Sequence, residues 1–481
     1  MPVKLASMAL GASLLCCSAR LGAQDADELG FSDVEAPPQP SAASPSPSPD
    51  GAAIELGATL RFQGVVRPTF ERVANARQLL ELHLDVRQEL GDARLRVFAA
   101  AHGEVDYRML ADPEGYDRET FDTYAWNVRP GEIYLAFEWR ALELRVGEQI
   151  FNLGQGEVLS VLDLMNPRDL REPLLTDPDY VRLPLLASRL GLAFDRTRLD
   201  VVVVHEPYFG LRAPPLGEWS PFRKLLLEDP RLGPALDDRT LRNQHLPEHR
   251  LLDLDATQLH ARSSWSGEGV DLALLASNLL DPIGVPTLPR ATEFEEPVVD
   301  VPIVHSRYAL FGHAGAYALG PCLLRWELAF EHERPVSVRR TNTPLERWDA
   351  ARSNALRGLL GLTYAPSSAT QVGFEAAQLL LLDALPPRSA LLFPLEAPQF
   401  ALRVSQKFWS ERFELAGVGL LIGLSPVNAW AARIELAYAP ADDLQLGLGY
   451  VTYHPSDRFG VFYGFERNDS LFFELRWTVS R

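Results

Sequence analysis

The stretch CLLRWELAFEHE, residues 322–333, alternates apolar and polar side chains one residue at a time. The apolar set is Leu324, Trp326, Leu328 and Phe330. The charged set between them is Arg325, Glu327 and Glu331. Strict alternation predicts a β-strand with two unlike faces. One face of this strand needs apolar surroundings, and the other needs a place for full charges of both signs.

The same alternation recurs in stretches such as GEIYLAFEWR (131–140), NAWAARIELAY (428–438) and SLFFELRWTVSR (470–481). From residue 54 onward the chain is almost all strand pattern, without a domain boundary. We predict eighteen strands, or sixteen if two are miscounted. Their ranges are 54–65, 77–90, 93–105, 131–139, 142–152, 188–194, 197–207, 256–266, 268–279, 305–316, 320–332, 354–365, 370–382, 398–408, 412–423, 428–438, 442–453 and 470–480.

The connections between these strands alternate in length. Those after even-numbered strands are very short, and most of those after odd-numbered strands are long. The long ones are 106–130, 153–187, 208–255, 280–304, 333–353, 383–397 and 454–469. Tight turns at one end and long loops at the other are typical of a transmembrane up-and-down β-barrel, in which every strand is antiparallel to its neighbours. The fold class that we predict is therefore all-β.

A soluble β-sandwich is the alternative, because one face of its sheets also packs on a core. Two features favour the barrel. Aromatic residues recur near strand ends, where a membrane interface holds amphipathic rings. These include Trp139, Phe408, Trp409, Tyr438, Tyr450, Tyr453 and Trp477. A barrel of this strand number also encloses an aqueous lumen, which the charged faces can line.

The first residues predict export. MPVKLASMALGASLLCCSARLGAQ (1–24) has a basic start, a short apolar run and small residues after it, as a secretory signal peptide does. A lipoprotein signal is the alternative, since Cys16 and Cys17 close the apolar run. We predict a signal peptide over 1–23, a disordered Pro/Ser-rich linker over 24–53 and an outer-membrane barrel over 54–481. The formal charge of −18 argues against nucleic acid as a partner.

The polar strand faces hold the candidate lumen residues. The basic ones are Arg145, Arg325, Arg357, Arg403, Arg433 and Arg476. The acidic ones are Glu132, Glu138, Glu327, Glu375, Glu435 and Glu474. Mixed rows of this kind either form cross-strand pairs that brace a wet wall or offer arginines as a track for a solute.

The segment LRVGEQIFNLGQGEVLSVLDLMNPRDLREPLL, residues 144–175, carries a motif. The chain resembles a poorly characterised family of bacterial outer-membrane β-barrels, porin-like or alginate-export-like, whose strand ends in Gly-x-Gln, runs through Trp-Gly and enters a loop with Asp and then Asn-Pro-x-Asp. The matching positions are Gly147, Gln149, Gly154, Asp163, Asn166, Pro167 and Asp169, while Leu153 stands where the family usually has Trp. The resemblance implies an outer-membrane barrel and supplies no substrate.

Loop 153–187 is the candidate constriction of the pore. Asn-Pro is a turn former, and mixed charges crowd the residues around it. The candidates for setting selectivity are Asp163, Asn166, Arg168, Asp169, Arg171 and Glu172. Either the loop folds into the lumen and these charges select the solute, or the motif packs the loop against the barrel rim with its charges paired among themselves.

The sequence gives little indication of metal binding or of an enzyme site. His245 and His249 are four residues apart, but Pro247 between them disfavours the helical turn that a metal site would use. No motif of a known enzyme class is present, although a lipase site could be assembled from residues distant in sequence. We predict no metal and no cofactor.

The sequence therefore predicts a porin-like outer-membrane channel for passive diffusion of a small solute, not an enzyme. The alternatives are a non-conducting structural or adhesion barrel, closed by loops 153–187 and 208–255, and an outer-membrane hydrolase or secreted all-β protein. The expected partners are outer-membrane lipid, the barrel-insertion machinery and the solute. The solute and the oligomeric state cannot be read from the sequence.

Overall fold

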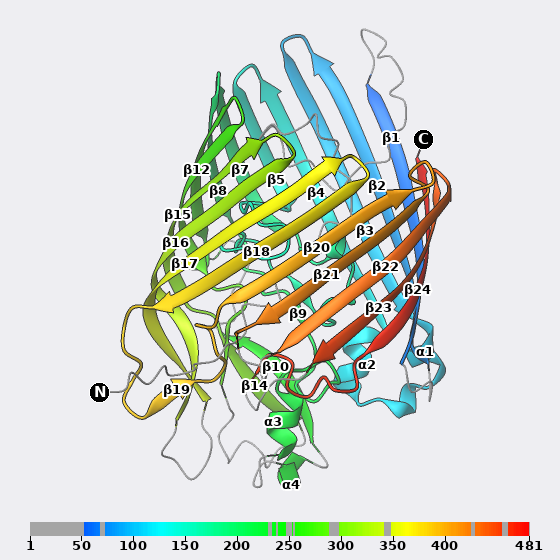
Figure 1. Ribbon diagram of the computed structural model, residues 1–481, viewed down its shortest axis with the longest axis vertical. Coiled ribbons are helices and arrows are strands. Elements are labelled where there is room, and N and C mark those ends of the chain that lie inside the picture. Colours follow the sequence, from blue (N-terminus) through cyan, green and yellow to red (C-terminus); the bar gives the residue numbers. More distant parts are fainter. Residues whose placement is uncertain are drawn as a thin grey trace.

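Eighteen strands form one closed antiparallel barrel in the computed structural model, which describes residues 52–67, 73–228, 233–236, 239–246, 253, 255–287, 298–340, 348–424, 429–454 and 460–480. Each barrel strand is hydrogen-bonded to two neighbours (Figure 1). The barrel strands are β1 (Ala53–Val66), β2 (Val73–Leu90), β3 (Ala93–Asp106), β4 (Trp126–Trp139), β5 (Leu142–Gln149), β7 (Leu185–Phe194), β8 (Thr197–Val204), β11 (Gln258–Gly267), β12 (Val270–Leu280), β15 (Arg307–Leu319), β16 (Cys322–Arg340), β17 (Trp348–Ser367), β18 (Thr370–Leu381), β20 (Gln399–Phe408), β21 (Phe413–Ile422), β22 (Trp430–Ala441), β23 (Leu444–His454) and β24 (Ser470–Ser480).

The last strand closes the ring on the first. β24 pairs with β1 in antiparallel register from Gly57 opposite Ser480 to Val66 opposite Leu471. Both strand edges that would otherwise be free are therefore paired. The predicted strand number of eighteen is confirmed. The sixteen-strand alternative and the β-sandwich alternative are wrong, because the strands form a single ring.

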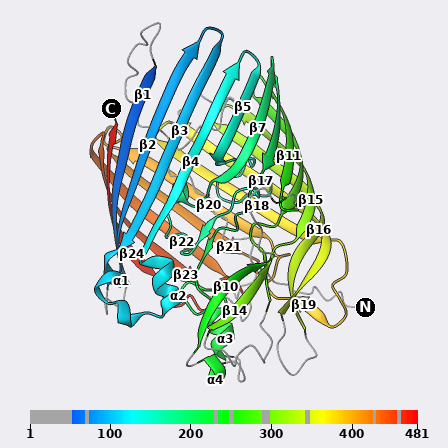
Figure 2. The same cartoon turned by 180° about the vertical axis from the view of Figure 1, so that it is seen from behind.

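The two ends of the barrel differ. The eight connections at one end are two to four residues long, from 91–92 between β2 and β3 to 442–443 between β22 and β23. The long connections join the strands at the other end (Figures 1 and 2) and contain short elements of their own. These are α1 (Tyr107–Ala111), α2 (Arg118–Tyr124), α3 (Arg223–Glu228), α4 (Gly233–Leu236), β6 (Asp169–Leu170), β9 (Leu211–Arg212), β10 (Thr240–Leu246), β13 (Val285–Pro286), β14 (Val298–Val304) and β19 (Ser389–Leu391), with 3₁₀ turns at Pro113–Gly115 and Pro178–Tyr180. The predicted length alternation is confirmed for most connections. The exceptions are 67–72, 341–347 and 423–429, which are short connections at the long-loop end; the predicted long loop 333–353 is wrong, because β16 and β17 extend into it.

None of the helices in the described part of the chain is long and apolar enough to span a membrane. They are four to seven residues long, and the strand prediction left them out because such short segments give no helical periodicity.

The barrel is apolar outside and charged inside. On β16 the side chains of Leu324, Leu328 and Phe330 are exposed, whereas those of Arg325 and Glu327 are buried. The same division holds around the ring, where large aliphatic and aromatic residues cover the outer face of every barrel strand. A water-soluble protein would bury such a surface, so the outer face of this barrel fits a lipid environment.

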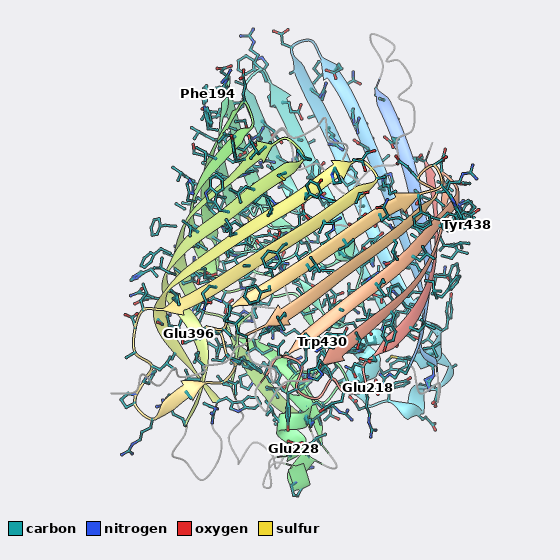
Figure 3. The ribbon with its side chains drawn as sticks, viewed as in Figure 1. Phe194, Glu218, Glu228, Glu396, Trp430 and Tyr438 are labelled. Carbon is teal, nitrogen blue, oxygen red and sulfur yellow. The ribbon has the colours of Figure 1, made fainter. Side chains whose placement is uncertain are left out.

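Aromatic side chains mark both ends of the apolar surface. Phe194 and Tyr438 lie near the short turns, and Trp430 lies toward the long connections (Figure 3). Near the short turns, Trp409 and Phe413 pack edge to face with ring centroids 4.8 Å apart, and Phe413 stacks on Tyr438 at 4.4 Å. Amphipathic rings at this position are stable at the headgroup level of a bilayer.

A charge on the outer face tests the lipid contact. Leu360 lies midway along the lipid-facing part of β17, and Leu319 lies beside a short turn; their exposed fractions are similar, 56% and 64%. We expect Leu360→Arg to lower the free energy of unfolding in lipid vesicles by about 2–4 kcal/mol and Leu319→Arg by about 0–1 kcal/mol, because an arginine near the interface reaches water. Denaturant titration of both variants measures the difference; equal effects would contradict a lipid-facing surface.

Candidate functional site

The connection between β5 and β7, residues 150–184, runs inside the barrel and is called the inward loop here. Most of its side chains are buried, including Phe151, Leu162 and Met165. Between the end of β5 and the start of β7 it forms two lobes, which bind different parts of the barrel wall. The first lobe is residues 155–162, and the second lobe is residues 169–177. Together they form the candidate functional site.

Two glutamates of the barrel wall hold the first lobe. Glu327 on β16 accepts hydrogen bonds from the backbone N–H groups of Gln155, Gly156 (2.8 Å), Val161 (2.6 Å) and Leu162 (2.8 Å). Its side chain is completely buried. Four N–H donors are enough to satisfy both oxygens of a buried carboxylate, so the loop supplies the hydrogen bonds that water would otherwise give to Glu327.

The second glutamate, Glu375 on β18, takes the N–H groups between those sets. It accepts hydrogen bonds from Glu157 at 2.5 Å, Val158 at 3.0 Å and Leu159 at 2.7 Å. Seven of the eight backbone N–H groups of the first lobe thus end on two wall carboxylates.

The side chain of Glu157 adds ion pairs in which the loop supplies the carboxylate and the wall supplies the cations. Its carboxylate lies 2.6 Å from Arg325 on β16 and 3.0 Å from Arg403 on β20. Arg357 on β17 donates a hydrogen bond of 3.3 Å to the carbonyl oxygen of Ser160. Three of the predicted lumen arginines therefore pair with the inward loop.

Apolar contacts fill the space between these polar groups. The first lobe contributes Val158, Leu159, Val161 and Leu162 to one buried cluster. The wall contributes larger apolar residues such as Leu359 and Leu420, together with four alanines, Ala273, Ala314, Ala329 and Ala401. Small inward side chains leave room for the lobe beside the wall, so the sequence of these strands accommodates a filled lumen at this level.

The second lobe is held by the other side of the barrel. Glu172 accepts hydrogen bonds from Arg77 on β2 (2.6 Å) and Asn75 (3.0 Å). Arg171 donates to Glu104 on β3 at 3.0 Å. Asp177 lies 3.0 Å from Arg61 on β1 and also pairs with Arg476 on β24.

The two lobes reach opposite walls. Around the ring, β17 is separated from β2 by ten strand steps in one direction and eight in the other. The first lobe docks around β17, on β16, β18 and β20, and the second lobe docks on β1 to β3 and β24. The inward loop therefore crosses the lumen from wall to wall.

Asn166 joins the two lobes at their common base. Its side-chain oxygen accepts from the N–H of Phe151 at 2.8 Å, and its amide nitrogen donates to the carbonyl oxygen of Leu183 at 2.8 Å. Leu183 donates its own N–H to the carbonyl oxygen of Pro167 at 2.9 Å. The Asn-Pro pair of the motif is thus the point where the loop's start, middle and end meet.

The charges next to Asn166 pair within the loop. Asp163 forms ion pairs with Arg168 at 2.9 Å and Arg182 at 2.8 Å. Burial raises the pKa of a carboxyl, but the two guanidiniums outweigh burial and hold the pKa of Asp163 below its usual range. The pKa of Asp169 is lowered in the same way, by Arg171 and Arg129 against the effect of burial.

The structure brings the six constriction candidates together as a framework. Asp163, Asn166 and Arg168 connect the lobes, and Arg171 and Glu172 bind the wall, while Asp169 pairs with Arg171 at 2.7 Å. All six side chains are buried. Their positions fit a role in holding the inward loop.

Partly exposed arginines of the barrel wall form what we call the arginine row: Arg87 (β2), Arg96 (β3), Arg145 (β5), Arg189 (β7) and Arg198 (β8). Arg87 stands opposite Arg96, and Arg145 stands opposite Arg189. Like charges at such positions repel. Buried carboxylates between them offset the repulsion, as in the hydrogen bonds of 2.6 Å and 2.8 Å from Arg87 and Arg96 to Asp85.

The arginine row offers more of its surface to the lumen than its acidic partners do. The side chain of Arg87 is 44% exposed, whereas that of Asp85 is 1% exposed. Glu143 and Asp200 are likewise more buried than the arginines they pair with. Of these five arginines, only Arg145 is among the lumen residues predicted from the sequence. The other four lie on the polar face of their strands. The apolar–polar alternation of each strand is therefore the signal that could have identified them.

The remaining lumen candidates also lie on inward strand faces. Glu474 pairs with Arg61 at 2.5 Å, and Glu435 pairs with Arg433 at 2.7 Å. Arg433 also donates to the carbonyl oxygen of Leu174 in the second lobe. Glu132 accepts from the N–H of Ile150 at 2.7 Å, at the start of the inward loop. Glu138 lies near a short turn, 3.5 Å from Arg94.

The connection 205–257 also reaches the inward loop. β9 pairs in parallel with β6, placing Leu211 opposite Asp169. Gly210 permits this approach: its φ is +78°, and a Cβ there would lie 2.4 Å from the carbonyl oxygen of Arg168. A second long connection therefore supports the loop from the other side.

His245 lies on β10. Its ring contacts the ring of His305, which is not the residue that the sequence suggested as a second metal ligand. The two ring nitrogens are 2.8 Å apart. Burial, together with Arg212, lowers the pKa of His245 to about 4. His249 lies outside the described residues. Among the residues that the structure describes, no group of three or more His, Cys, Asp or Glu side chains could hold a metal ion.

Fold and site together define a closed eighteen-stranded barrel whose lumen is crossed by one folded connection.

No protein-family model matches the chain, and no curated protein matches it. Among solved structures the chain is similar to three proteins of Pseudomonas aeruginosa. OccK5 (OpdH) is 10% identical, with 89% of this chain and 97% of that chain covered and a TM-score of 0.47. The outer membrane protein OpdK is 11% identical (89% and 99%, TM-score 0.48), and OccK8 (OprE) is 10% identical (89% and 98%, TM-score 0.48). Likenesses of this size carry no conclusion about function.

Removing the amide of Asn166 tests the connection between the lobes. We expect Asn166→Ala to destabilise the inward loop by about 1–3 kcal/mol, because a buried N–H and a buried carbonyl group lose their partner. Limited proteolysis within 150–184 measures the effect, with Asn354→Ala as a control, since Asn354 bonds to His332 and Glu333 at the barrel rim. Unchanged proteolysis of Asn166→Ala would show that the loop does not depend on this residue.

Proposed function

We propose that the protein is a porin-like outer-membrane channel through which a small solute diffuses passively. The observation that carries the proposal is the inward loop, which is pinned to opposite walls and narrows a lumen lined with charge. A closed barrel of this strand number leaves an aqueous channel unless something fills it. A folded loop at mid-lumen then sets the width and the chemistry of the narrowest section.

The membrane assignment rests on the outer surface. An apolar outer face with aromatic side chains at both ends is the surface that a bilayer requires of a spanning barrel. The signal peptide over 1–23 and the linker over 24–53, most of which lies outside the described residues, remain predictions that agree with export. Outer-membrane lipid and the barrel-insertion machinery are the partners that this location implies.

The partly exposed arginine row supports a preference for anions. Guanidiniums that face the lumen attract negative solutes, and a lumen between low-dielectric walls strengthens the attraction relative to bulk water. The overall charge of −18 does not oppose this, because selectivity depends on the charges along the path and not on the total.

A non-conducting structural or adhesion barrel is the second candidate. It is favoured by the number of contacts that the inward loop makes with both walls and by the pairing of β9 with β6. A measurement of conductance separates it from the channel, since a lumen closed by the two connections passes no current.

An outer-membrane hydrolase is a weaker alternative. Two serines bond to histidines: Ser188 lies 2.8 Å from His205, and Ser277 lies 3.0 Å from His260. Within the described residues neither histidine has a hydrogen-bonded carboxylate to orient it, as a catalytic triad requires. We therefore propose a channel and not an enzyme, and an esterase assay of the purified barrel tests this point.

Conductance in a planar bilayer tests the channel. We expect discrete single-channel steps and a reversal potential that favours chloride over potassium in a KCl gradient. Replacing Arg145 and Arg189 with Gln should lower the chloride-to-potassium permeability ratio about threefold. Each charge removed at roughly 8 Å from the ion path weakens attraction by about 0.5 kcal/mol in water, and salt screens part of it.

Arg140→Gln is the matched control, because Arg140 lies in a short turn outside the lumen and pairs with Asp92. It should leave the permeability ratio unchanged. Absence of current from the correctly folded protein would reject the channel in favour of the closed barrel. Current without ion preference would keep the channel and reject the role of the arginine row.

A further inference from the structure

The first lobe has the structure of an anion-binding loop whose anion belongs to the protein itself. Backbone N–H groups that converge on one point form a concave anion site. Here seven N–H groups of residues 155–162 converge on two points, and the groups that occupy them are the carboxylates of Glu327 and Glu375.

The backbone of the first lobe is shaped for this arrangement. A Cβ on Gly156 would lie 1.7 Å from the carbonyl oxygen of Leu159, so only glycine permits this turn. Such a turn directs N–H groups from both of its sides toward one carboxylate. Ser160 adds its hydroxyl at 3.5 Å from the same oxygen of Glu327 that accepts from Val161.

The two glutamates are bound by the first lobe alone in the part of the chain that the structure describes. There, every hydrogen bond to Glu327 and Glu375 comes from residues 155–162. Glu331, four residues along the same inward face of β16, is held instead by Arg334 at 2.6 Å and Arg357 at 3.3 Å. Glu327 and Glu375 are thus placed to bind the loop, whereas Glu331 braces the wall.

We propose that Glu327 and Glu375 are the positioning residues of the constriction. Their carboxylates hold the first lobe against β16 and β18, and the apolar contacts beneath it follow from that position. The negative charge is the essential property. A glutamine in the same place keeps one acceptor oxygen, but its NH₂ group points a donor at the N–H donors of the lobe.

Chemical rescue tests the proposal. In Glu327→Ala/Glu375→Ala, each substitution removes a group the size of acetate and leaves the N–H groups of the lobe unpaired. We expect amide hydrogen exchange of residues 155–162 to become about 10- to 100-fold faster, since each hydrogen bond to a charged group contributes strongly. Sodium acetate should then slow exchange at least about threefold by occupying the vacated sites. Wild-type exchange should not respond to acetate.

Glu435→Gln is the control for loss of a lumen carboxylate, because Glu435 pairs with Arg433 on β22 and, among the described residues, forms no hydrogen bond or ion pair with the first lobe. It should leave exchange of 155–162 unchanged. Unchanged exchange in the double alanine variant would overturn the proposal. Faster exchange that acetate does not reverse would also overturn it, because that result assigns the effect to lost packing. If the double variant does not fold, Glu375→Gln decides the matter by the same exchange measurement.

A second readout deepens the proposed function and rests on it. In single-channel records the double alanine variant should show larger and noisier currents, and acetate should restore the wild-type level. A wild-type protein that passes no current would reject the channel, yet hydrogen exchange would still decide whether the two carboxylates hold the lobe.

Discussion

Closure of the hydrogen-bonded ring is the constraint on which the rest of this structure depends. A strand surrounded by hydrocarbon has no water to satisfy its backbone, so each N–H and C=O group must find a partner on a neighbouring strand. The pairing of β24 with β1 provides the last set of partners. Once the ring is closed, apolar side chains can face outward, and most charged side chains of the strands are confined to the lumen.

That confinement creates a second problem, which the inward loop solves. A lumen wide enough for water leaves wall charges hydrated, whereas a loop inside it displaces this water and must replace it. Here the loop supplies part of that replacement itself. Wall carboxylates meet backbone N–H groups in the first lobe, and wall arginines meet loop carboxylates in both lobes. Where the loop is absent, as along the arginine row, guanidinium groups remain partly exposed.

The sequence was sufficient for the barrel and insufficient for the interior. Period-two alternation and loop-length alternation are local signals, and they predicted the strands, their number and the end that carries the long connections. The docking of residue 157 on β16 and β20, or of Glu172 on β2, joins positions far apart in the chain. No local pattern encodes such contacts. The segment around Asn166 drew attention to this loop, but no local pattern showed that its charges would be buried in the framework while Arg87 and Arg189 lie on the lumen side of the wall.

The wall-to-wall course of the inward loop also bears on the shape of the barrel. A ring of strands resists stretching along its hydrogen bonds but flattens easily, because bending between neighbouring strands costs little. A folded connection that is bound to opposite walls opposes flattening, because flattening would change the distance between the two sites where it is bound. The cross-section of this barrel is therefore set by two sets of ion pairs near its diameter as well as by its strand number. Lateral pressure from the membrane would act on those ion pairs before it acted on the strands.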